Sequence, residues 1–92
     1  MEVFYIGKDR KRLYFKNYER RPDDEEFEEV VSKLKNNNCE FMKNLMGPDC
    51  DIYRYKINDM YFDLVRTIDG DGNFLYCDDI NVMHIIEKMF KK

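Results

Sequence analysis

The chain has 92 residues, of which 43% are apolar and 38% are charged. This apolar content excludes a disordered, charge-swollen chain, and no stretch is long and apolar enough for a transmembrane helix. We expect one domain over residues 1–92, because a chain of this length is too short for two. We also expect it to be cytoplasmic, since its N-terminus lacks the basic flank and apolar stretch of a secretory signal.

The formal net charge is −3, from 16 basic and 19 acidic residues. The charges are segregated along the chain: residues 8–21 hold seven bases and two acids, whereas residues 22–29 hold six acids and no base. The segregation predicts one basic end and a larger acidic surface. A net negative charge argues against nucleic acid as the main partner.

The first half of the chain predicts a hairpin, a helix and a strand. Residues 2–7 and 12–17 are runs of β-forming residues joined by a charged turn, the pattern of a hairpin. Pro22 and the acids after it predict the start of a helix, which ends at the three asparagines 36–38. The helix carries an apolar stripe at i, i+3, i+4 and i+7, made of Phe27, Val30, Val31 and Leu34. Residues 39–46 fit a helix or a strand, and the strand is preferred because a Gly-Pro-Asp turn follows.

The second half predicts three more strands and a final helix. Residues 52–57 and 60–68 alternate between apolar and polar side chains, and Asn58-Asp59 between them is a two-residue hairpin signal. A turn over residues 69–72 leads into a strand at 73–77, after which Asp78 or Asp79 caps the last helix. Its apolar stripe is Val82, Met83, Ile86, Met89 and Phe90. The order ββαββββα predicts an α+β fold, with an antiparallel sheet of five to six strands and two helices packed on one face.

Patterns for catalysis and metal binding are sparse. His84 is the only histidine, and a Cys77–His84 pair is conceivable, but a packing role for this histidine is favoured. Cys39, Cys50 and Cys77 lack the close pairing of zinc ligands, so we expect three reduced thiols and no metal. Residues 69–73 begin like a calcium loop without its later Gly and Glu, which favours a plain turn. We therefore expect a protein without enzymatic activity or cofactor.

The acidic run at residues 23–29 is the preferred binding surface. Six carboxylates in seven positions are more than compensation of the helix dipole needs. Like charges at i, i+3 and i+4 also lower helix stability. Burial of the apolar stripe should turn several of them outward, where they would meet a basic protein. The expected partner-binding residues are Asp24, Glu25, Glu28 and Glu29, with Asp59, Asp69 and Asp71 at hairpin tips. The alternative is a plain solvated surface.

The basic segment at residues 8–21 supports a different function. With Tyr14, Phe15 and Tyr18 it could stack bases and hold phosphates, in a small nucleic-acid-binding protein or an RNA endonuclease. Lys11, Arg12 and Arg20 would then dominate binding. A solvated hairpin whose aromatic residues enter the core is favoured over this function, because the rest of the chain would repel a polyanion.

Three segments in the middle of the chain resemble one class of bacterial protein. They are Leu34-Lys35-Asn36-Asn37-Asn38, the stretch from Leu45 to Tyr53 and the stretch from Phe62 to Asp69. Over roughly residues 34–76 the chain resembles small immunity proteins encoded beside polymorphic toxins, including those of contact-dependent inhibition systems. The resemblance implies that the protein binds and neutralises one cognate toxin, often a nuclease, in the cytoplasm. A phage-encoded inhibitor of a host nuclease would share this mechanism, and an exposed edge strand would give a route to a homodimer.

Overall fold

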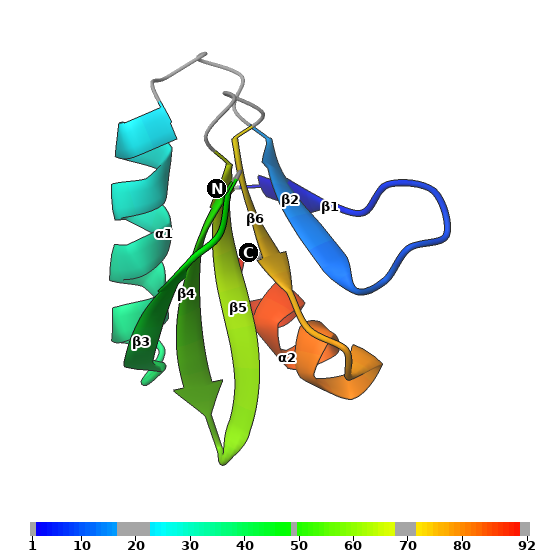
Figure 1. The fold of residues 1–92 in the computed structure, drawn as a ribbon. Helices are drawn as coiled ribbons and strands as arrows, with labels where there is room; N and C mark the ends of the chain where they lie inside the picture. The colour runs from blue at the N-terminus through cyan, green and yellow to red at the C-terminus, as the bar shows by residue number, and fades with distance from the viewer. Residues whose placement is uncertain (1, 17–22, 49, 68–71, 91–92) are drawn as a thin grey trace.

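Two helices pack against one face of a six-stranded antiparallel sheet in the computed structural model, which describes residues 2–16, 23–48, 50–67 and 72–90 (Figure 1). The elements in chain order are β1 (Glu2–Phe4), β2 (Arg12–Lys16), α1 (Asp23–Asn36), β3 (Glu40–Met46), β4 (Cys50–Ile57), β5 (Met60–Thr67), β6 (Asn73–Tyr76) and α2 (Ile80–Phe90). Across the sheet the strand order is β1-β2-β6-β5-β4-β3. The predicted α+β fold and element order are confirmed.

Helix α1 packs through the predicted stripe and ends at an asparagine. Val30 and Leu34 are fully buried, and Phe27 packs beside them against the core. At the end of the helix Asn38 adopts a φ of 63°, which an asparagine tolerates better than most residues. The Cys39 N–H then donates to the Leu34 carbonyl at 3.0 Å. This is a Schellman cap, and it turns the chain directly into β3.

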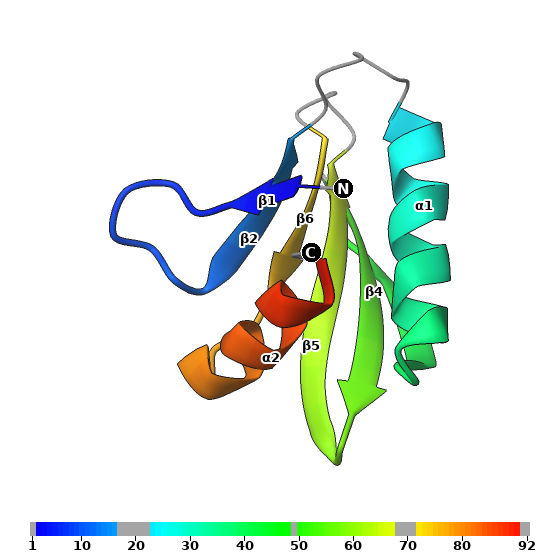
Figure 2. The same cartoon turned by 180° about the vertical axis from the view of Figure 1, so that it is seen from behind.

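Helix α2 lies across the same face of the sheet, as Figure 2 shows from behind. Asp79 caps it, since its Oδ1 accepts a hydrogen bond from the Asn81 N–H at 2.9 Å. Its buried side chains are Val82, Met83, Ile86 and Phe90. The Phe90 ring meets Phe15 of β2 edge to face, with the ring centroids 5.3 Å apart. The stripe predicted for this helix is therefore confirmed.

The β4–β5 hairpin follows the sequence pattern closely. Asn58 and Asp59 both have positive φ, 48° and 66°, as a type I′ turn requires. Tyr55 and Phe62 lie on the face of these strands that the helices cover, and both are buried, with ring centroids 5.8 Å apart. Strand β4 begins two residues before the predicted strand.

The first strand differs most from its prediction, since β1 ends at Phe4 and not at residue 7. The chain leaves the sheet there into a loop where Gly7 has a φ of 58° and the Asp9 N–H donates to the Ile6 carbonyl at 3.2 Å. Predictions that fall on Pro22, on Ile68 and on residues 69–71 lie outside the described residues. Among the described residues, neither helix is long and apolar enough to span a membrane.

Candidate binding surfaces

The acidic face of α1, meaning Asp24, Glu25, Glu28 and Glu29, points largely outward. Asp24, Glu25 and Glu28 are exposed, and Glu29 is half-buried. Asp24 forms an ion pair with Arg66 of β5. Glu25 and Glu28 make no hydrogen bond or ion pair with any residue that the structure describes. Two carboxylates of the predicted surface are therefore available to a partner.

Glu26 behaves differently from its neighbours, which the sequence reasoning missed. Its side chain is only 5% exposed. Oε1 of Glu26 accepts a hydrogen bond from Nδ2 of Asn73 on β6, at 3.2 Å, and Asn73 is itself buried. A signal was present in the sequence, because Glu26 lies four residues before Val30 and therefore on the buried side of the helix.

The acidic hairpin tip lies far from the acidic face of α1. Asp59 is exposed and pairs with Lys56 at 3.4 Å. In Figure 1 the β4–β5 turn is at the opposite end of the molecule from the first turn of α1. Asp69 and Asp71 lie outside the described residues. The described residues thus show two separate acidic sites, not one joined surface.

An apolar row crosses the sheet on the face that the helices leave open. Residues directly opposite one another on paired strands share a face, so the registers of all five strand pairs define the row. Its members, from β1 to β3, are Phe4, Tyr14, Phe74, Val65, Ile52 and Leu45. The rings of Phe4, Tyr14 and Phe74 lie side by side, with centroids 5.7 and 5.4 Å apart. Sequence alternation assigns side chains to faces, but this row depends on which strands are neighbours.

A polar row runs beside the apolar row. In strand order it consists of Arg12, Tyr76, Asp63, Arg54 and Lys43. Arg54 donates two hydrogen bonds to Asp63, from Nε at 3.0 Å and from Nη2 at 3.4 Å. The Arg12 guanidinium lies 5.3 Å from the centroid of the Tyr76 ring. The open face therefore carries aromatic rings and two arginines, Arg12 and Arg54, and each of these arginines is paired with an acid of the chain.

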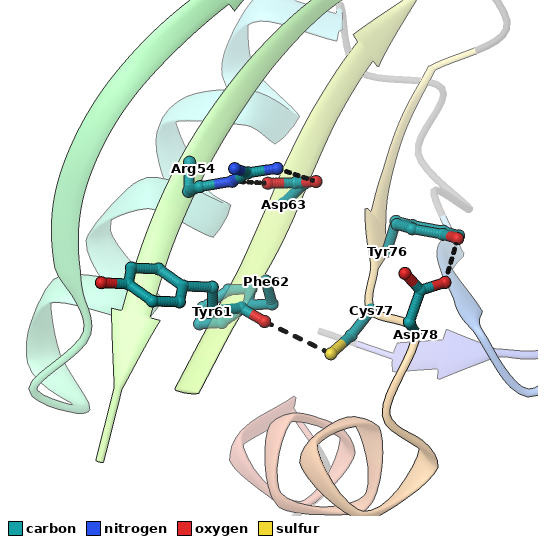
Figure 3. Close-up of a pocket in the computed structure, with 7 residues that line it drawn as sticks. All are labelled: Arg54, Tyr61, Phe62, Asp63, Tyr76, Cys77 and Asp78. Atoms are coloured by element: carbon teal, nitrogen blue, oxygen red, sulfur yellow. Dashed lines mark hydrogen bonds and ion pairs between the residues drawn. The ribbon is translucent and has the colours of Figure 1, made fainter. Parts of the chain in front are cut away.

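A pocket of about 230 Å³ opens where β6 separates from β5 (Figure 3). It is lined by Arg54, Tyr61, Phe62, Asp63, Tyr76, Cys77 and Asp78. Both of its carboxylates are already engaged: Asp63 by Arg54 and Asp78 by the Tyr76 hydroxyl, which donates to it. That hydrogen bond, more than burial, raises the pKa of Tyr76. The charged groups that line the pocket are thus bonded to one another.

In the basic loop before β2, the carboxylate of Asp9 is hydrogen-bonded to neighbouring residues. Asp9 accepts hydrogen bonds from the Lys11 N–H at 2.8 Å and from Arg12 Nη1 at 3.0 Å. These donors lower the pKa of the Asp9 carboxyl. Phe15 is buried as expected for a core residue, whereas Tyr14 lies on the open face. Tyr18 and Arg20 are outside the described residues.

The thiols and the histidine do not form a reactive pair. Burial raises the pKa of Cys39 to about 11, and burial is also the main cause that raises the pKa of Cys77. The Cys77 thiol donates to the Tyr61 carbonyl, at 3.4 Å. The His84 side chain is 66% exposed, and its Nδ1 lies 3.9 Å from Glu87 Oε1. Nowhere in the described ranges do three or more His, Cys, Asp or Glu residues group closely enough to hold a metal ion.

Comparisons of the chain with known protein families, with curated proteins and with solved structures find no match.

Proposed function

We propose that this protein is a non-enzymatic, protein-binding inhibitor of the immunity-protein kind. It would neutralise a cognate toxin by covering a basic surface of that toxin with the acidic face of α1. One observation carries the proposal: Glu25 and Glu28 are exposed and make no contact with a described cation. The resemblance of residues 34–76 to immunity proteins points to the same class.

The acidic face is held rigidly, which favours its use as a docking surface. On one flank of α1, Asp24 pairs with Arg66, whose guanidinium also lies 5.1 Å from the Phe27 ring centroid. On the other flank, Glu26 accepts the hydrogen bond from Asn73. Because these contacts join the first turns of α1 to β5 and β6, the backbone that carries Glu25 and Glu28 needs little ordering when a partner binds, and only their side chains lose freedom.

Replacing both free carboxylates should slow association. For the double variant Glu25→Gln/Glu28→Gln we expect an on-rate about three- to tenfold lower at low salt, because exposed charges steer encounter more than they add affinity. The difference should shrink at high salt, where screening removes the steering. The measurement is stopped-flow or surface plasmon resonance binding to the partner protein that a pull-down from the native host identifies.

The matched control removes the same charge elsewhere, in the double variant Glu2→Gln/Glu40→Gln on β1 and β3. Its association rate should stay within about twofold of the unmodified protein, since both positions are remote from the acidic face. If the two double variants slowed association equally, net charge and not α1 would be responsible. If neither changed the rate, the acidic face would not be the docking surface.

A second candidate function is the binding of single-stranded nucleic acid on the open face. It is favoured by Tyr14, which lies between Phe4 and Phe74 with Arg12 on the same strand. Neighbouring aromatic rings beside a basic side chain can form a platform on which nucleotides stack. The ion pairs on this face argue against this candidate function, because Arg12 and Arg54 are already paired with acids of this chain.

Binding to single-stranded RNA at low salt tests this second candidate. Electrostatic binding to phosphates is strongest at about 50 mM salt, so an RNA-binding protein should be retained there on a poly(U) column. The variant Tyr14→Ala should then elute earlier than the control Tyr61→Ala. We expect the protein to flow through, as its net negative charge predicts, and retention would favour the nucleic-acid function.

A further inference from the structure

Strand β3 is an exposed apolar edge of the sheet. Among the strands that the structure describes it pairs only with β4, and all seven of its residues are exposed. Four of them are large and apolar: Phe41, Met42, Leu45 and Met46, the last of which is 83% exposed. The opposite edge is formed by β1, which has three residues. A long edge strand of this composition is a template for pairing with another strand.

The hydrogen-bonding groups that β3 leaves free can be assigned from its register. The Gly47 N–H donates to the Cys50 carbonyl at 2.8 Å, so residues 47 and 50 form a hydrogen-bonded pair. Hydrogen-bonded and non-hydrogen-bonded pairs alternate along an antiparallel ladder. Leu45 and Ile52 are therefore the next hydrogen-bonded pair, and Lys43 and Arg54 the one after. The N–H and C=O groups of Asn44 and Met46 point away from β4, toward the free edge.

We propose that this edge binds a second copy of the chain, so that two β3 strands pair antiparallel about a two-fold axis at Leu45. In this register Asn44 lies opposite Met46 of the second copy, and these residues exchange the hydrogen bonds that each edge leaves free. The two Leu45 residues form the non-hydrogen-bonded pair on the axis, where opposing side chains are closest. Two six-stranded sheets become one continuous sheet.

Three features of the surface fit a second copy. The apolar row ends at Leu45 on this edge, so the proposed register continues the row from one subunit into the other. The charged side chains of β3, Glu40 and Lys43, are opposite in sign. In this register Lys43 faces Gly47 of the second copy, so no like charges meet.

The irregularity in β3 limits the contact to its second half. The register with β4 shifts between Phe41 and Lys43, and a bulge of this kind interrupts edge pairing. Residues 43–46 are regular, and Pro48 follows without an N–H to donate. A contact of about five residues is only about 16 Å long. We therefore expect a weak dimer, with an interface below the roughly 800 Å² per partner of stable complexes.

Disulfide trapping tests the register. A Leu45→Cys variant should form an intersubunit disulfide under mild oxidation, because Cα atoms of a non-hydrogen-bonded pair are about 4.5 Å apart, within disulfide range. The matched control is Met46→Cys, whose symmetry mates would be roughly 8 Å apart and too distant to bridge. Both variants are made in a Cys50→Ser background, because the thiol of Cys50 is only half-buried and could react with the introduced cysteine. Equal trapping at the two positions would overturn the proposed register.

Sedimentation equilibrium from about 10 µM to 1 mM, the range expected for a small interface, tests the dimer itself. The unmodified protein should shift from monomer toward dimer across this range. Asn44→Pro should abolish the shift, because it removes an edge N–H that β4 does not use, while Asn44→Ser should retain it. As a second disrupting variant, Leu45→Lys places like charges opposite each other on the axis.

The dimer proposal fails if the unmodified protein stays monomeric to about 1 mM, or if the dimer survives both Asn44→Pro and Leu45→Lys. A monomeric protein would leave the edge to a strand of another protein or to solvent. None of these outcomes bears on the acidic face of α1, because the dimer experiment contains no toxin. The two proposals can therefore fail independently.

Discussion

Replacing Phe62 by alanine is expected to lower the free energy of unfolding by about 3–5 kcal/mol, the usual cost of deleting a buried phenylalanine side chain. Phe62 is 2% exposed and stacks on Tyr55. It lies on β5, which pairs with β4 and β6 in the middle of the sheet. The cavity would open where both neighbouring strands hold the backbone, so collapse around it should be limited. A loss of this size is a large share of the stability of a small domain.

The adjacent residue supplies the control. Tyr61 is on the same strand, points to the open face and is 52% exposed. Tyr61→Ala should cost about 1 kcal/mol or less, mainly through lower strand propensity. Urea denaturation followed by circular dichroism measures both variants, and the slope m should not change. Equal losses at the two positions would mean that the core does not lie between the sheet and the helices.

Removing the buried hydrogen bond between Asn73 and Glu26 should also destabilise the protein strongly. For Asn73→Ala we expect a loss of about 1–3 kcal/mol, because the buried Glu26 side chain loses a donor and a buried acceptor left without its partner is costly. Glu26→Ala should cost a similar amount. In the double variant the losses should not add, and the coupling energy should be about 1–2 kcal/mol.

Glu25→Ala is the matched control for this cycle, since Glu25 is the next residue on α1 and is exposed. It should change the free energy of unfolding by about 0.5 kcal/mol or less. Additive losses in the double variant would show that Asn73 and Glu26 stabilise the fold separately. The same outcome would weaken the inference that α1 is held rigidly, because that contact joins one of its flanks to β6.

The local structure of this protein could be predicted from its sequence because short-range rules determine it. The stripes of α1 and α2 follow from apolar residues at helical spacing. The type I′ turn at Asn58-Asp59 follows from residues that tolerate positive φ. Alternation of apolar and polar residues groups Tyr55 with one face of its strand and Phe62 with one face of the next, and both of these faces are covered in the fold. In each case the residues that interact lie within a few positions of one another in the chain.

The candidate site was only partly predictable. The outward position of Glu25 and Glu28 follows from burial of the stripe on α1, and it needs no knowledge of the sheet. Whether Glu26 joins them depends on Asn73, 47 residues further along the chain. The spacing to Val30 marks Glu26 as an acid on the buried side of α1, whereas its hydrogen-bond partner on β6 is set by the tertiary structure.

The sequence by itself determined the apolar stripe that each helix buries and where most elements begin and end. Only the tertiary structure decided that β2 pairs with β6, which brings Tyr14 opposite Phe74 and completes the apolar row. It also decided that β3 would be an edge strand, so that the backbone N–H and C=O groups of Asn44 and Met46 point away from β4. The physical reason is that periodicity specifies the face of a strand, whereas neighbours and edges are set by long-range pairing, in which every strand competes for the same backbone hydrogen bonds.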